Sequence, residues 1–123
     1  MTQEIKIILA ISDSEASKKV YEMIESQNGL TIAAEAFNPV ETLMLMAETE
    51  ADLVMLDLPD TNEDPGICSH LLAEFPQLVI IALSSNCQEA ILYRHNISKT
   101  RIKDASDKQI LALIRQIKEE EKD

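Results

Sequence analysis

Four residues with chemically useful side chains are expected to converge at one edge of the fold. Asp13 and Asp57 supply carboxylates, Ser84 a hydroxyl and Lys103 an ammonium group, and each lies at the end of a predicted strand. Two neighbouring carboxylates favour a hard divalent cation, and Mg²⁺ fits best because it accepts one or two carboxylates and keeps several waters. Ser84 (favoured over the adjacent Ser85) and Lys103 could hold phosphoryl oxygens. Asp57 could then attack phosphorus as a nucleophile, which predicts an aspartyl phosphate.

An alternation of apolar runs and amphipathic segments predicts the elements that position these side chains. The predicted strands are residues 5–11, 30–36, 51–58, 78–83 and 99–103, the last accepted mainly because the alternation requires it. Five helices are predicted, and two of them are residues 14–26 and 67–75. Another begins at the capping residue Asn38 and has Leu43, Met44 and Ala47 on its apolar face. The remaining two run from Ser85 or Asn86 through Tyr93, and from a capping box at Ser106 to Ile117. Five βα units predict a doubly wound parallel sheet with helices on both faces, in which ligands bind at the carboxyl ends of the strands.

The length and net charge of the chain limit the classes of function that it can have. A chain of 123 residues corresponds to about one domain. Its net charge of −11 argues against nucleic-acid binding and against binding to an anionic membrane surface. No apolar run reaches the ~18 residues of a membrane span. With only two cysteines, Cys68 and Cys87, no disulfide framework is implied, and we expect a cytoplasmic protein.

Two short segments carry a resemblance to a known family. Residues 51–58 (ADLVMLDL) resemble the phosphoacceptor strand of response-regulator receiver domains of two-component signalling, and residues 103–106 (KDAS) are similar to the stretch around the family's signature lysine. The likeness extends from Lys6 to about Ile117 and is strongest to receivers joined to helix-turn-helix output domains. It implies these roles: Asp57 as phosphoacceptor, Asp13 and Asp57 with the Pro59 carbonyl as Mg²⁺ ligands, Ser84 as switch hydroxyl, and Lys103 as phosphoryl contact.

The resemblance also implies a fold and a role. The expected fold is a flavodoxin-like (βα)5 domain with a five-stranded parallel sheet in the order 2-1-3-4-5, filling residues 1–123 with a core of about 5–117. The expected role is that of a phosphoryl acceptor in a phosphorelay, not an enzyme beyond self-phosphorylation and slow self-dephosphorylation. A sensor histidine kinase or phosphotransfer protein would supply the phosphoryl group, and the modified surface would act on a partner or a homodimer. Any DNA-binding output that regulates transcription would lie outside this chain.

Three departures from the family pattern leave an alternative open. Ser12 stands where the first of two acidic residues is usual, Thr100 where an aromatic switch residue is usual, and the loop over residues 59–66 is altered. Losing one carboxylate near Mg²⁺ is expected to cost ~1–2 kcal/mol, which is roughly tenfold in affinity. The alternative is therefore a degenerate pseudo-receiver that acts as a phosphorylation-independent interaction or dimerisation module. A flavodoxin-like enzyme is disfavoured because the chain has no glycine-rich phosphate loop.

Overall fold

The structure, a computed structural model, describes residues 4–58, 66–84, 89–94, 99–103 and 106–121. Its strands are Ile5–Ala10 (β1), Leu30–Glu35 (β2), Leu53–Asp57 (β3), Val79–Leu83 (β4), Ala90–Arg94 (β5) and Lys99–Ile102 (β6). Its helices are Ser14–Glu25 (α1), Pro39–Glu48 (α2), Gly66–Glu74 (α3) and Asp107–Glu121 (α4). No helix among the described residues is both long enough and apolar enough to cross a membrane.

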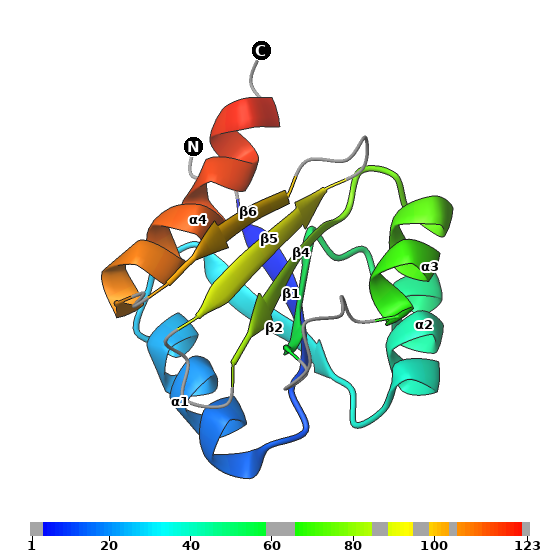
Figure 1. Cartoon of the computed structure of the whole chain (residues 1–123), viewed down its shortest axis with the longest axis horizontal. Coiled ribbons are helices and arrows are strands. Elements are labelled where there is room, and N and C mark those ends of the chain that lie inside the picture. Colours follow the sequence, from blue (N-terminus) through cyan, green and yellow to red (C-terminus); the bar gives the residue numbers. More distant parts are fainter. Residues whose placement is uncertain (1–3, 59–65, 85–88, 95–98, 104–105, 122–123) are drawn as a thin grey trace.

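The six strands form one sheet in the order β2-β1-β3-β4-β5-β6. The first four strands in this order pair in parallel, with β1 between β2 and β3, and β3 between β1 and β4. Helices α1 and α4 cover one face of the sheet, and α2 and α3 cover the other (Figure 1). The predicted α/β fold, with helices on both faces and the strand order 2-1-3-4, is confirmed.

The central strands form because their side chains are buried on both faces. Along β1, β3 and β4, alternate residues point into two separate cores, with Ile7 and Ile81 in one and Ile8 and Ile80 in the other. Each of these four side chains is fully buried. Such near-continuous apolar runs are typical of parallel strands enclosed by two helical layers. The layers therefore hold the carboxyl ends of β1 and β3 side by side.

Helix boundaries follow the predicted caps. Asp13 accepts the Ala16 N–H at the start of α1, and Asn38 accepts the Glu41 N–H at the start of α2. Before α4, Ser106 and Gln109 form both bonds of a capping box. After α1, Gly29 has φ of 88°, a left-handed conformation that glycine adopts without steric cost. These boundaries confirm the helix starts predicted at Asn38 and Ser106.

The predicted fourth helix, ending at Tyr93, is wrong. Residues Ala90–Arg94 form β5, which pairs antiparallel with β4, and the expected caps Ser85 and Asn86 lie outside the described residues. From Ala90 to Tyr93 every side chain is buried. A helix presents only one stripe to the core, so four consecutive buried residues fit a strand better than a surface helix. A short apolar run is ambiguous between the two forms.

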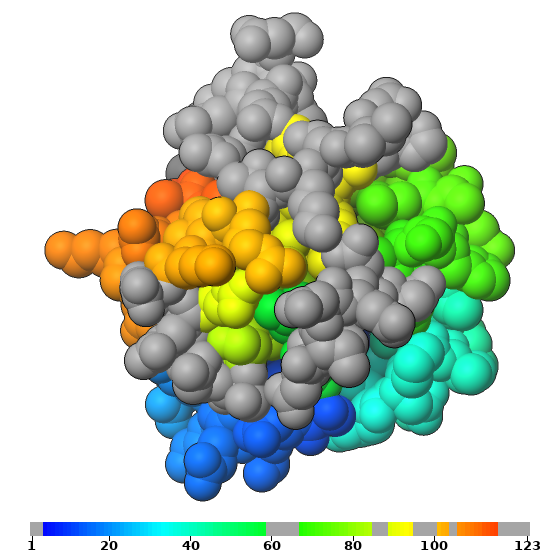
Figure 2. All heavy atoms as spheres, viewed as in Figure 1, coloured from blue at the N-terminus to red at the C-terminus, as the bar shows by residue number. Residues whose placement is uncertain are grey.

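The hairpin β5–β6 also corrects the five-stranded, wholly parallel sheet. Residues 99–102 are a strand, as predicted. We expected this strand to pair in parallel with β4, but β6 pairs antiparallel with β5. Two antiparallel steps give β6 the same direction as β4, so its carboxyl end still lies at the edge where β1 and β3 end. In the space-filling view, β6 lies at the front of the molecule, with α1 below it and α2 and α3 to its right (Figure 2).

Candidate functional site

Asp57 ends β3 at the carboxyl edge of the sheet and is held there by Ser12. The Ser12 backbone N–H donates to Asp57 Oδ2 over 2.7 Å, and the Ser12 hydroxyl donates to the same oxygen over 2.6 Å. The Asp57 side chain is half-buried. Its other oxygen, Oδ1, accepts no hydrogen bond from the described part of the chain. Asp57 therefore has one oxygen bonded to a neutral neighbour and one oxygen that accepts no hydrogen bond from any described residue.

Ser12 is the site residue whose contact the sequence did not reveal. Its type predicts no added charge and at most a weak cap, yet it is the direct partner of Asp57. The register of β1 against β3 explains the contact. Ala10 pairs with Leu56, so the residues that follow them, which include Ser12 and Asp57, lie side by side at the end of the two strands. The signal was present in principle: β1 and β3 are expected to end at the same edge, and Ser12 comes two residues after β1.

Asp13 lies next to Ser12 and serves as a helix cap. Its Oδ1 accepts the Ala16 N–H over 2.9 Å, and the side chain is exposed. A carboxylate at a helix N-terminus is favoured by the partial positive charge of the free N–H groups there. The cap uses one oxygen of Asp13, and Asp13 directly follows the residue that contacts Asp57.

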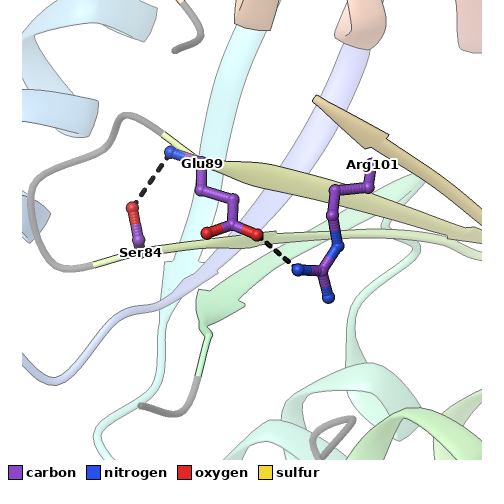
Figure 3. A network of polar contacts seen from close by, with 3 residues as sticks. All are labelled: Ser84, Glu89 and Arg101. Atoms are coloured by element: carbon purple, nitrogen blue, oxygen red, sulfur yellow. Dashed lines mark hydrogen bonds and ion pairs between the residues drawn. The ribbon is translucent and has the colours of Figure 1, made fainter. Parts of the chain in front are cut away.

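Ser84 comes directly after β4 and bonds to Glu89, which directly precedes β5 (Figure 3). Its hydroxyl accepts the Glu89 N–H over 3.0 Å, and its own N–H donates to the Glu89 carbonyl over 2.9 Å. The Glu89 carboxylate in turn accepts from Arg101 of β6 over 2.6 Å. The predicted switch hydroxyl is thus one strand away from Asp57 and is bonded to the backbone of Glu89.

Lys103 comes after β6 and is exposed. Neighbouring strands lie ~4.8 Å apart, so β6 is roughly 14 Å from β3 across the sheet, against roughly 10 Å if β6 paired directly with β4. The inserted β5 therefore moves Lys103 one strand further from Asp57 than the family resemblance implies. Thr100 lies opposite Leu92 in the same hairpin.

The candidate metal ligands are only partly described. The Pro59 carbonyl lies outside the described residues, as does the altered loop. Within the described residues, no group of three or more His, Cys, Asp or Glu side chains is arranged to hold a metal ion. Asp13 and Asp57 each retain one oxygen outside the hydrogen bonds above, and Mg²⁺ needs only one or two carboxylates. These carboxylate donors are of the type that Mg²⁺ prefers. The site has one negative charge fewer than a site with a full acidic pair, because Ser12 is neutral.

Comparisons with known proteins identify the fold. No family model matches the chain, and no curated protein matches its sequence. Among solved structures, the isolated receiver domain of RcsB from Salmonella enterica serovar Typhimurium, with the phosphomimetic BeF3⁻, is similar at a TM-score of 0.59 and 17% identity. That match covers 67% of this chain and 62% of the other. RcsB bound to promoter rprA matches at 0.58 and 19%, and two RcsB dimers bound to two parallel DNAs at 0.59 and 17%.

These matches show a receiver-like fold. The aligned part spans 43% of the DNA-bound RcsB chains, so this chain corresponds to less than half their length. At such low identity the shared property is the arrangement of the sheet and helices, because fold alone does not determine function. The expectation of a response-regulator receiver fold is confirmed, and what the site does must come from its own residues.

Proposed function

We propose that this chain is a receiver-fold signalling module that works through protein contacts and does not depend on phosphorylation. The observation that carries this proposal is the pair of hydrogen bonds from Ser12 to Asp57 Oδ2. Hydrogen bonds to a carboxylate are stronger than those between neutral groups. Ser12 therefore stabilises the Asp57 charge without a cation and ties the end of β1 to the end of β3.

The position of Lys103 supports the same role. An incoming phosphoryl group on Asp57 needs positive charge to stabilise the oxygens on which charge develops. Lys103 is three strands away from Asp57, and Ser84 is engaged by the backbone of Glu89. Of the two groups expected to contact phosphoryl oxygens, Lys103 is displaced and Ser84 is already hydrogen-bonded. This arrangement favours signalling through binding of a partner over signalling through phosphorylation. We place this module in the cytoplasm, in keeping with a chain that has only two cysteines.

The second candidate function is phosphoryl acceptance at Asp57, and one observation favours it. Oδ1 of Asp57 accepts no hydrogen bond from the described residues, and Asp13 lies beside Ser12 at the same edge. In this function Oδ1 attacks the phosphorus of a phosphohistidine on a sensor kinase or phosphotransfer protein. The new O–P bond forms as the P–N bond breaks, and the imidazole nitrogen leaves with the electron pair. Bound Mg²⁺, held by Asp13, Asp57 and the Pro59 carbonyl, would supply charge neutralisation for this transfer.

The two functions also have different consequences for the binding of a partner. A phosphoacceptor would switch a partner or homodimer surface, and a DNA-binding output would have to be carried elsewhere. A phosphorylation-independent module would bind its partner with the same affinity whether or not a phosphoryl mimic is present. This difference makes the response to the mimic the decisive observation.

The test is an amide-resolved titration. The protein is mixed with millimolar Mg²⁺ and beryllofluoride, a phosphoryl mimic, while backbone amide shifts of residues 12–13, 56–58 and 83–84 are monitored by NMR. We expect beryllofluoride to cause no change in the native chain beyond any shift that Mg²⁺ alone produces. The control is Ser12→Asp, which restores a second carboxylate and is expected to gain Mg²⁺-dependent shifts at these amides.

A different result would overturn the proposal. Saturable shifts in the native chain that vanish in Asp57→Asn would establish phosphoryl acceptance at Asp57. If the shifts persist in Asp57→Asn, the mimic binds elsewhere, and the phosphoacceptor function of Asp57 is then excluded.

A further inference from the structure

Helix α2 carries a stripe of exposed apolar side chains, which we call the α2 stripe. Its three large members are Phe37, Val40 and Met44, with exposed fractions of 75%, 66% and 57%. Val40, Met44 and the exposed Ala47 are spaced four and three residues apart, which puts them on one side of α2, and Phe37 directly precedes the Asn38 cap. Single exposed apolar residues are ordinary, but a contiguous row indicates a surface that another molecule covers.

The stripe corrects an expectation about α2. The spacing predicts Met44 and Ala47 on the side facing the core, yet both are exposed. The inward side is formed instead by Thr42 and Met46, which are buried. The helix therefore has apolar residues on both sides, and only one of them faces the core.

The geometry of the helix start holds the stripe in place. The Asn38 side chain accepts the Glu41 N–H over 2.8 Å, and the Glu41 carboxylate accepts the Phe37 N–H over 2.9 Å. These reciprocal bonds fasten the backbone of Phe37 to the first turn of α2. The Phe37 ring contributes little to the fold, since three quarters of the residue is exposed. A large ring on an anchored backbone is preorganised to bind, because little ordering entropy remains to be lost.

The charges around the stripe define what can cover it. Residues 20–93 contain 13 Asp and Glu residues and no Lys or Arg. Three of these carboxylates, on Glu41, Glu48 and Glu50, belong to α2 or the residues just after it. Like charges facing one another across an interface are unfavourable. A second copy of the chain, docking α2 on α2, would bring these acidic residues together, whereas a basic partner would pair with them.

We propose that the α2 stripe docks a basic amphipathic helix of a partner protein. Apolar side chains of the partner would pack on Phe37, Val40 and Met44, while its Lys and Arg residues would face the flanking glutamates. This inference rests on the proposed interaction role and names its surface and partner chemistry. Helix α2, which carries the stripe, covers the same sheet face as α3, and α1 and α4 cover the other (Figure 1).

The test uses designed peptides as probes. One is a helical peptide of about 20 residues with leucines along one side and lysines flanking them; a second keeps the leucines and replaces every lysine with glutamate. Affinity is measured by fluorescence anisotropy and the contact surface by amide shifts, without Mg²⁺ or beryllofluoride. We expect the lysine peptide to bind, shifting residues 37–48, and the glutamate peptide to bind at least about tenfold more weakly.

Matched variants locate the binding energy. Val40→Ser with Met44→Ser is expected to weaken the lysine peptide about tenfold or more, since a few central apolar residues dominate most interfaces. The control is Tyr21→Ser, which removes another exposed large side chain from α1, on the opposite sheet face, and should change the affinity less than about twofold. Because Val40 and Met44 are more than half exposed, the double variant should unfold at nearly the native temperature.

Several outcomes would overturn the inference. Unchanged peptide affinity in the double variant, or shifts that map away from α2, would exclude the stripe as the docking site. Sedimentation equilibrium showing a dimer that the double variant dissociates would assign the stripe to a second copy. Binding to vesicles of anionic phospholipid that the double variant loses would assign it to a membrane. Beryllofluoride binding at Asp57 would overturn only the phosphorylation-independent function and leave the peptide result standing.

Discussion

Two serines form hydrogen bonds at the same edge of the sheet, one with a carboxylate and the other with the backbone of a glutamate. At the ends of β1 and β3, Ser12 donates both its hydroxyl and its N–H to the Asp57 carboxylate. Between β4 and β6, Ser84 accepts the backbone N–H of Glu89, while the Glu89 carboxylate pairs with Arg101. Asp57 has no cation among its described neighbours, whereas the carboxylate of Glu89 is paired with the charge of Arg101.

The difference separates a candidate functional site from a structural one. Glu89 is already neutralised by Arg101, so it has little to gain from another cation. Among the described residues Asp57 is stabilised by the dipoles of Ser12, so a cation or a protonated partner group would still bind favourably to its other oxygen. We call the part of this edge at β1 and β3, which carries Ser12 and Asp57, the reactive half. The part at β4, β5 and β6, where Glu89 pairs with Arg101, is the closed half.

The largest effect is expected from removing the carboxylate of the reactive half. Asp57→Ala leaves the Ser12 N–H and hydroxyl without their acceptor, which should lower the free energy of unfolding by about 2 kcal/mol. Asp57→Asn keeps an acceptor oxygen and should cost roughly half as much. Urea unfolding at neutral pH measures both. An increase in stability in either variant would mean that Asp57 is strained and that Ser12 does not compensate for it.

The next effect concerns metal affinity. Ser12→Asp adds a third carboxylate beside Asp13 and Asp57, and we expect Mg²⁺ affinity to rise roughly tenfold. Without metal the same variant should be less stable than the native chain, because like charges are brought together as the hydroxyl donor is lost. Calorimetric titration measures the affinity, and Ser12→Asn serves as the uncharged control. Equal affinities in both variants would show that the site does not bind cations through this position.

A smaller effect is expected in the closed half. Glu89 and Arg101 are 31% and 39% exposed in their side chains, so solvent screens the pair. Arg101→Met should cost about 0.5 kcal/mol of unfolding free energy, and a double-mutant cycle with Glu89→Gln should give a coupling of the same size. Neither change should alter the binding of Mg²⁺. A change in Mg²⁺ binding would mean that the two halves of the edge are coupled.

The smallest effect lies outside the sheet edge, at the Tyr21 phenol of α1. The Glu25 carboxylate, one turn after Tyr21 in α1, raises the pKa of the Tyr21 phenol above its ordinary value of 10.0. The stability from this protonated phenol is present below pH 10 and is lost as the pH rises through the raised pKa. Glu25→Gln should bring the pKa back towards 10, as measured from the Tyr21 ring signals in a pH titration by NMR. An unchanged pKa would exclude Glu25 as the cause.

Much of the parallel half could be predicted from local patterns. The runs that became β1, β3 and β4 are apolar and branched, and Asn38 and Ser106 signal helix starts within a few residues. Periodicity and capping are properties of neighbouring residues, so they can be recognised without knowing the rest of the fold. For the same reason Asp13 and Asp57 could be assigned to one edge of the sheet. The run at Ala90–Tyr93 is too short for its period to distinguish a strand from a helix, and the hairpin was missed.

The sequence by itself determined that this chain forms an α/β sheet with acidic residues at the ends of β1 and β3, because those features depend on local spacing. Only the tertiary structure decided which groups meet. The register of β1 against β3 brings Ser12 to Asp57, the antiparallel β5 moves Lys103 a strand further away, and the packing of α2 turns Met44 outward. Each depends on contacts between residues far apart in the chain, whose pairing is selected by the burial of the whole sheet rather than by any one segment.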